Sequence, residues 1–400
     1  MVRQVRYFIF LKDIALLSLT SFGGPQAHLA HFQQVLVNKR KYLSDTDLTD
    51  IYALCQVLPG PTSTQTLCAL GYRLGGPALA YLTLLIWLLP SVAIMTTAGV
   101  LVASFEDKQI SLDFTRFIQP MAVGMVAYAA YSISLKTVNT KTGLTLMVVA
   151  GVSSYFIQTP FVFPVILLLA GLVTSLKYKS QPKEERGSFQ VRWENFILWA
   201  AVFIVVALLG WATKSIPPLT VPIRLFENFY RNGSLIFGGG QVLTPMLYTE
   251  FVQYAKPLHH PISHHEFLSG YAFAQSLPGP VFSFAAFIGA LSLRDYGVGS
   301  EVFGAVMSAA GIFLPGTFLI FFMIRVWDSL KKFRPIRASL EGIHAANAGL
   351  VAAAAIILFQ PLQNTATNFG FTIGAFCLMA FTKLPSWSII LFGLLLGFIL

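Results

Sequence analysis

The sequence has little charge and little cysteine. Only 11% of its 400 residues are Asp, Glu, Lys or Arg, whereas 55% are hydrophobic. A soluble domain carries roughly 25% charged residues, so this chain could not cover its surface with polar groups in water. The three cysteines (Cys55, Cys68 and Cys377) lie in apolar segments without metal-site or disulfide spacing, and we expect buried free thiols.

The motifs of an enzyme are also missing. The sequence contains no recognisable nucleophile–base set, phosphate-binding loop or metal motif, so we expect neither catalysis nor a cofactor. The net charge of +10 would suggest nucleic acid in a soluble protein. Here the basic residues gather in short loops, as they do where charge sets orientation in a bilayer, and we expect no nucleic-acid partner.

Long apolar runs are abundant, for example at 142–176, 193–213 and 384–400. A helix needs about 20 apolar residues to cross the hydrocarbon core of a bilayer. We therefore predict an all-α polytopic membrane protein surrounded by lipid.

Four short motifs occur twice, in the same order and at a nearly constant separation. The pairs are 22–26 with 237–241, 56–61 with 275–280, 89–90 with 314–315, and 122–127 with 347–352. Weak internal symmetry of this kind is common in transporters. We predict a first repeat at 1–176, a basic linker with an extra transmembrane helix at 177–221, and a second repeat at 222–400.

The charges of the loops predict that the two repeats are inverted. Lys39, Arg40 and Lys41 form a basic loop, whereas the loop 105–115 is acidic. Basic loops stay cytoplasmic, so one of the two elements between these loops should be re-entrant, and the segment carrying 56–61 is the candidate. In the alternative, all thirteen segments cross as broken helices, and the single extra helix still inverts the repeats.

The paired motifs place glycine and proline inside apolar segments. Glycine lets the backbone turn, and proline suits the first turn of a new helix. Helix N-termini then meet within the membrane, where their free N–H groups offer an anion site without a buried lysine. A glutamine stands beside each break, and its amide can donate to an oxyanion. The simpler alternative is that these are glycine–proline kinks whose amides join helices.

We therefore predict an anion-binding site formed by both repeats. In the first repeat its candidate residues are Ser21, Gly23, Gly24, Pro25, Gln26, Gln56, Pro59, Gly60, Pro61, Thr62 and Ser63. In the second repeat they are Gly238, Gly239, Gly240, Gln241, Gln275, Pro278, Gly279 and Pro280.

Other polar residues receive structural interpretations. His28 and His31 follow the first break, but their matches in the second repeat are Leu243 and Met246, which favours a structural or loop-facing role. Asp13 and Glu250 lie near segment ends, where we expect exposure at the membrane interface. Arg73 and Arg294 end matching elements and are expected to snorkel or to attract an anion.

The motifs resemble those of the chromate ion transporter (CHR) family over nearly the whole chain. They read LTSFGGPQAHLAHF and CQVLPGPTSTQ in the first repeat, and FGGGQVLTPML and AQSLPGPVFSFAAFIGA in the second. The resemblance implies a plasma-membrane carrier that expels chromate and confers resistance, with sulfate as a structural analogue. Because Val281 and Phe282 stand where the first repeat has Thr62 and Ser63, we expect the first repeat to give polar contacts and the second a more apolar wall.

Three other functions stay open at this point. One is a carrier for sulfate or another oxyanion, because charge does not separate sulfate from chromate. The others are an anion channel and a membrane scaffold without transport. The sequence also leaves a homodimer open.

Overall fold

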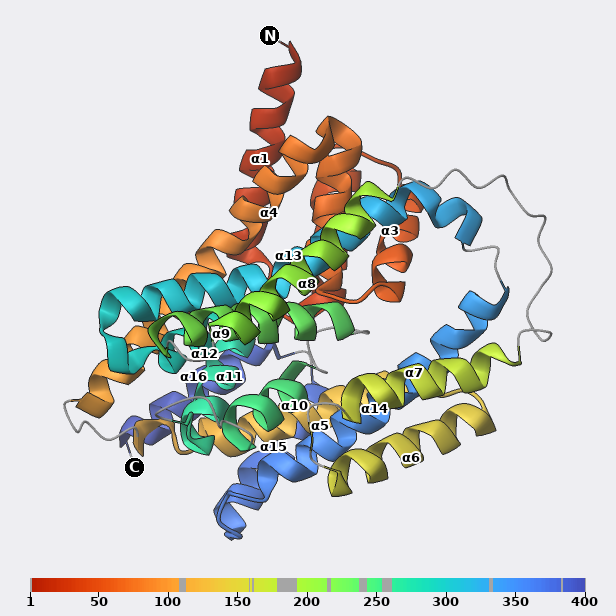
Figure 1. The fold of residues 1–400 in the computed structure, drawn as a ribbon. Coiled ribbons are helices and arrows are strands. Elements are labelled where there is room, and N and C mark those ends of the chain that lie inside the picture. The colour runs from red at the N-terminus through yellow and green to blue at the C-terminus, as the bar shows by residue number, and fades with distance from the viewer. Residues whose placement is uncertain are drawn as a thin grey trace.

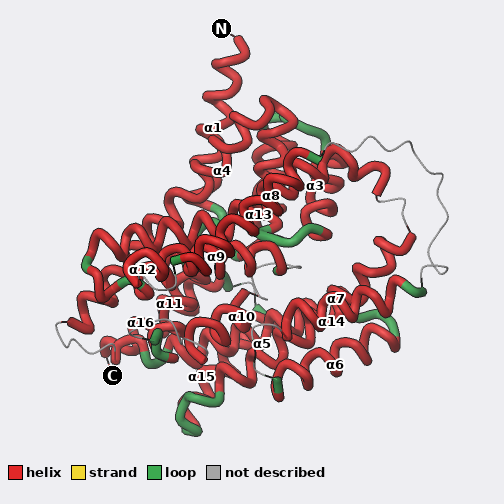
Figure 2. Tube along the Cα trace, in the orientation of Figure 1, coloured by secondary structure: helices red, strands yellow, loops and turns green. Residues whose placement is uncertain are grey.

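The computed structural model describes residues 2–107, 113–157, 159, 162–177, 193–213, 217–236, 243–253, 261–330, 334–382 and 384–399. Over these residues the chain is helical, without a strand (Figure 2).

The first repeat has its helices in the order that the apolar segments predict. They are α1 (Val2–Thr20), α2 (Gly24–Phe32), the π-helical η1 (Gln33–Lys39), α3 (Asp45–Val57), α4 (Thr62–Asp107), η2 (Asp113–Thr115), α5 (Ile118–Thr137), α6 (Lys141–Phe156) and α7 (Val162–Ser175).

The second repeat follows the same order. Its elements are α9 (Pro217–Leu235), α10 (Leu243–Tyr248), η4 (Thr249–Gln253), α11 (His264–Ser276), η5 (Val281–Ser283), α12 (Phe284–Ser292), η6 (Arg294–Tyr296), α13 (Val298–Leu330), α14 (Arg334–Phe359), α15 (Ala366–Phe381) and α16 (Ser386–Ile399). Between the repeats lies α8 (Glu194–Ala212), which has no match and packs against α9 and α13. The prediction of two helical repeats joined by one extra helix is confirmed.

Helix α4 is two helices joined by a sharp bend. Its 46 residues would span about 70 Å, more than twice the hydrocarbon thickness. Gly76 interrupts it with φ 75° and ψ −166°, a conformation that a side chain would strain. We call 62–75 the short arm and 77–107 the long arm. In the second repeat Gly297 adopts a similar conformation (φ 83°, ψ 167°) where α13 begins.

The helices on either side of each Pro-Gly-Pro turn form a hairpin. The first hairpin consists of α3 and the short arm, and its outer ends are joined by an ion pair between Arg73 and Asp47 at 3.6 Å. The second consists of α11 with η5 and α12, joined by Arg294 and Glu266 at 2.5 Å. Because both outer ends of a hairpin lie together, each hairpin brings the chain back to the end from which it started. The re-entrant placement of these hairpins in the membrane stays a prediction.

The acidic member of each pair also caps its helix. Ser44 and Asp47 form a capping box at the start of α3, and Ser263 and Glu266 do the same for α11. Both arginines are thus assigned to ion pairs, a role that the sequence interpretation did not consider.

Two carboxylates expected at the membrane interface are buried instead. Asp13 on α1 is 3% exposed and accepts hydrogen bonds from Arg40 and from the Tyr42 hydroxyl, each at 2.8 Å. Burial raises the pKa of Tyr42 to about 12, so this hydroxyl stays a donor. Glu250 is 9% exposed and accepts from Arg231 and from Asn232. The expectation of exposure was wrong, because a buried charge is tolerated when paired and hydrogen-bonded.

The two repeats are interlocked through their later helices. α6 and α7 of the first repeat pack on α14 of the second, and α15 packs on α5 (Figure 1). Matched glycines permit this approach. A Cβ on Gly124 would lie 2.2 Å from the Thr372 carbonyl oxygen, and one on Gly349 would lie 2.0 Å from that of Met147. Small residues let membrane helices pack backbone to backbone.

Five described helical segments are long and apolar enough to cross a membrane. They are Thr62–Phe105, Asp113–Thr137, Glu194–Ala212, Val298–Val326 and Ala338–Phe359. The multi-pass membrane prediction is therefore confirmed. Cys55 and Cys68 are buried free thiols, as predicted, and Cys377 is a half-buried one.

Candidate functional site

The first break lies between α1 and α2. Gly23 and Gly24 have φ of 93° and 80°, which favour glycine, and Pro25 stands in the first turn of α2. Ser21 is fully buried before the turn, whereas Gly23 is exposed and Pro25 is half-buried. The side chain of Gln26 lies outside the described part of the chain.

The Pro-Gly-Pro turns have matching backbones. Gly60 has φ 117° and Gly279 has φ 94°. In the first repeat the turn and the start of the short arm are buried, from Pro59 through Ser63. In the second repeat Pro278 is half-buried, and Gly279 and Pro280 are buried.

Two hydrogen bonds cross between the repeats at these breaks. The N–H of Gly60 donates to the carbonyl of Ile236 at 2.7 Å, and the N–H of Gly279 donates to the carbonyl of Ser21 at 2.8 Å. Ile236 stands two residues before the second glycine run, whose predicted residues Gly238, Gly239, Gly240 and Gln241 lie outside the described residues. Each Pro-Gly-Pro turn is thus bonded to the end of the helix that precedes the other repeat's glycine motif.

Each turn also packs against the long helix of the other repeat, next to the proline within that helix. A Cβ on Gly60 would lie 3.2 Å from the Cα of Gly316, which follows Pro315 in α13. One on Gly279 would lie 3.3 Å from the Cβ of Ser91, which follows Pro90 in the long arm. The matched Leu-Pro pairs at 89–90 and 314–315 therefore mark the surfaces on which the turns pack.

Gln65 is a polar residue of the site that the sequence prediction missed. It is 1% exposed, and its amide donates to the Pro59 carbonyl at 2.8 Å and to the Gly316 carbonyl at 3.2 Å. Its side-chain oxygen has no hydrogen-bond partner among the described residues. The available signal was an amide inside an apolar segment directly after the break, where uncompensated polar groups are costly.

The predicted glutamines at the ends of α3 and α11 have different surroundings. Gln56 is exposed. At the matched place Gln275 is half-buried and donates to the Tyr271 hydroxyl at 2.6 Å. The role of these amides in binding stays a prediction.

Both turns are followed by buried hydroxyl groups. Thr62 and Ser63 are buried at the start of the short arm, and Thr64 accepts a hydrogen bond from the Trp87 indole at 3.1 Å. Ser283 matches Thr64, is 1% exposed, and its hydroxyl has no partner in the described structure. The second turn therefore also carries a buried hydroxyl, at the third residue after Pro280. The unequal contribution of the two repeats to binding stays a prediction.

The geometry offers anion-binding groups without a buried lysine in the motifs. The first turns of the short arm and of η5–α12 begin at the two Pro-Gly-Pro turns, so their N–H groups point back toward the breaks. Buried hydroxyls lie in both first turns. These are the neutral donors that can replace the water around an anion.

Comparison with known proteins agrees with the duplication. The family model for chromate transporters matches residues 9–176 and 223–398. The chain belongs to the chromate transporter family. Both repeats are matched separately, and the segment between them, which contains α8, is left out.

Individual relatives match over nearly their full lengths. A chromate transport protein of Cupriavidus metallidurans is 26% identical, with 99% of this chain and 92% of the relative covered. A probable chromate transport protein of Synechococcus elongatus is 27% identical, with 94% and 88% covered. An uncharacterized transporter of Methanocaldococcus jannaschii is 22% identical, with 98% and 93% covered. No solved structure matches this chain.

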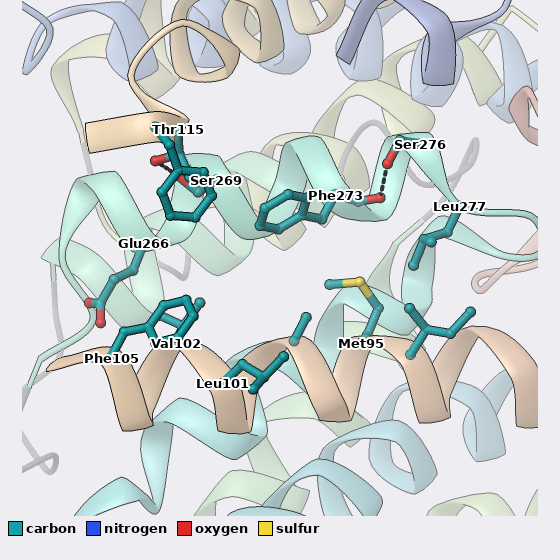
Figure 3. A pocket seen from close by; sticks show the side chains of 13 residues that line it. Met95, Leu101, Val102, Phe105, Thr115, Glu266, Ser269, Phe273, Ser276 and Leu277 are labelled. Carbon is teal, nitrogen blue, oxygen red and sulfur yellow. Dashed lines mark hydrogen bonds between the residues drawn. The ribbon is translucent and has the colours of Figure 1, made fainter. Parts of the chain in front are cut away.

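A cavity of about 260 Å³ lies between the long arm of α4 and α11 (Figure 3). Apolar side chains such as Met95, Leu101, Val102 and Phe273 line most of it. Its polar side chains offer little to an anion. The Ser269 hydroxyl already donates to Thr115 at 3.0 Å, and Glu266 is a carboxylate, which would repel an anion. An anion there would lose its water without gaining donors, so this cavity differs chemically from the candidate site at the breaks.

Proposed function

We propose that this protein is a secondary carrier that exports chromate across the plasma membrane and thereby confers chromate resistance. Membership of the chromate transporter family supports a transport function. The observation that carries the proposal is the pair of crossed hydrogen bonds, Gly60 to Ile236 and Gly279 to Ser21. These bonds support the proposal because each joins the Pro-Gly-Pro turn of one repeat to the break of the other.

The chromate dianion is held by neutral donors in this proposal. The N–H groups at the start of the short arm and of η5–α12 supply partial positive charge. The hydroxyls of Thr62 and Ser63 and the amides of Gln56 and Gln275 add directed hydrogen bonds. The glycine motifs at 23–24 and 238–240 allow the backbone to approach the ion closely.

The membrane potential supplies the driving force for export. Moving one charge through 100 mV is worth about 2.3 kcal/mol, so a dianion leaving a cell with a negative interior gains roughly 4.6 kcal/mol. Alternating access between two inverted repeats then needs no nucleotide. The fixed site lies where the repeats meet, and rocking of one repeat against the other exposes it to either side.

The test is flux in proteoliposomes of purified protein with an imposed potential. We expect saturable chromate movement toward the positive side, counter-exchange with preloaded chromate, and weaker competition by sulfate. In a chromate-sensitive host the protein should raise the tolerated chromate concentration. Sulfate flux that exceeds chromate flux would favour the general oxyanion carrier, inward-only movement would contradict export, and unitary currents without counter-exchange would favour a channel.

A further inference from the structure

The carbonyl of Ser21 accepts two hydrogen bonds from different parts of the chain. One comes from Gly279 in the turn of the second repeat, at 2.8 Å. The other comes from Nε2 of His28 in α2, at 3.1 Å. A carbonyl oxygen only accepts, so Nε2 carries the proton and Nδ1 carries the lone pair. Nδ1 is buried and has no partner in the described part of the chain.

Aromatic packing holds the His28 ring in this position. The ring is 1% exposed and meets Trp87 edge to face, with centroids 5.4 Å apart. Phe32, one turn further along α2, lies against both rings. The Trp87 indole donates to the Thr64 hydroxyl in the first turn of the short arm. A continuous set of contacts thus runs from Thr64 through Trp87 and His28 to Ser21 and Gly279.

The matched positions of the second repeat carry residue types that cannot make this set of contacts. The residues that match His28, Trp87 and Thr64 are Leu243, Ile312 and Ser283, and all three are buried. The carbonyl of Ile236 accepts from Gly60, but the matched positions offer it no histidine donor. The two crossed bonds are therefore similar in backbone geometry, but within the described residues the histidine bond to the accepting carbonyl is found at Ser21 and not at Ile236.

We propose that His28 is a positioning residue that orients the Ser21 carbonyl to receive the N–H of Gly279. By doing so it sets the place of the second repeat's Pro-Gly-Pro turn against the first repeat's break. The link between His28 and transport rests on the proposed function, in which these turns form the substrate site. His28 needs no contact with the substrate, because the effect passes through one carbonyl group.

The first experiment measures the crossed bond without any substrate. Hydrogen exchange of a peptide that contains Gly279 is followed by mass spectrometry in lipid nanodiscs. In His28→Leu, which introduces the second repeat's residue, we expect this amide to exchange about three- to tenfold faster, as the weakening of one hydrogen bond implies. His28→Gln keeps a donor at nearly the same reach and should restore slow exchange. Ala30→Leu, exposed on the same helix, is the control and should leave it unchanged.

The second experiment measures the kinetics of transport. We expect His28→Leu to raise KM for the transported anion several-fold and His28→Gln to restore it. Identical exchange in wild type and His28→Leu would overturn the proposal, and so would failure of Gln to rescue in a protein that is folded as judged by its exchange elsewhere. If the carrier proves to move no chromate, the exchange result still decides the role of His28, so the two hypotheses fail separately.

Discussion

The two hairpins share a backbone design but differ in how they are held. In the second repeat Arg294 and Glu266 are 8% and 9% exposed, whereas in the first Arg73 and Asp47 are 43% and 51% exposed. At the inner ends, beside the Pro-Gly-Pro turns, it is the first hairpin that has the additional hydrogen bonds. The first turn is braced by the Gln65 amide, and the match of Gln65 is Phe284, which packs among Phe267, Tyr271 and Phe287.

The two hairpins share the backbone conformation of the turn and differ in the side chains that support it. The positive φ at Gly60 and Gly279 is required by the turn itself, so glycine stands at both places. The side chains that support the turn need only supply enough contact or enough hydrogen bonds, and these have diverged. A hairpin closed tightly at its outer end and one braced at its inner end are two solutions for the same backbone.

The largest effect is expected from a side chain at the first turn. In Gly60→Leu the new Cβ would meet Gly316 at 3.2 Å in a conformation that is strained for any side chain. We expect loss of transport while the protein still inserts into membranes, measured as flux per inserted protein.

Gly24→Leu offers the comparison with the first break. Apart from its chain neighbours and its own helix backbone, no described atom lies within 4 Å of a Cβ at Gly24, so its φ of 80° is the main strain on this residue. We expect transport to be lost here as well, because the break itself needs this conformation. Wild-type flux in either variant would contradict the assignment of the site.

The outer ion pairs should differ in their effect on stability. Arg294→Ala leaves Glu266 buried without its partner and should destabilise the protein by about 3–5 kcal/mol. Arg73→Ala removes an exposed pair and should cost about 0–1 kcal/mol. Thermal unfolding in detergent measures the loss of stability in both variants. As a control, Glu266→Gln is combined with Arg294→Ala, which removes the unpaired buried charge and should restore part of the stability. Equal shifts for the two single variants would show that burial does not distinguish the hairpins.

Removal of the Gln65 amide tests the brace of the first turn. Gln65→Leu loses the donor to the Pro59 and Gly316 carbonyls, and we expect transport to fall about tenfold from two hydrogen bonds of ordinary strength. Phe284→Leu, at the matched position, should alter packing of the second turn without this loss of hydrogen bonds. The two variants are compared by chromate flux at saturating concentration. Unchanged flux in Gln65→Leu would show that the Gln65 hydrogen bonds are not needed for transport.

The smallest effect is expected at the exposed end of α3. Gln56→Leu removes one amide donor and should weaken oxyanion affinity about fivefold, the range of a single hydrogen bond. The affinity is measured by isothermal titration calorimetry of chromate into purified protein. Affinity equal to wild type would exclude Gln56 from the site.

Much of the architecture was predictable because it depends on local properties. Apolar length indicates a membrane helix, and a Gly-Pro motif inside such a run indicates a break. The glycine conformations at 23, 24, 60 and 279 confirm this reading of the motifs. The predictions failed where a partner far along the chain decides the outcome, as for Asp13 and Glu250, whose burial depends on Arg40 and on Arg231.

The amino-acid sequence by itself determined the membrane-spanning class, the duplication and the positions of the breaks, since each follows from residue types within one short segment. Only the tertiary structure decided which breaks meet, that each turn bonds to the opposite repeat, and that His28 and Gln65 support them. The physical reason is that a hydrogen bond such as Gly279 to Ser21 joins groups far apart along the chain. No local propensity specifies such a partner, which depends on how all the helices pack together.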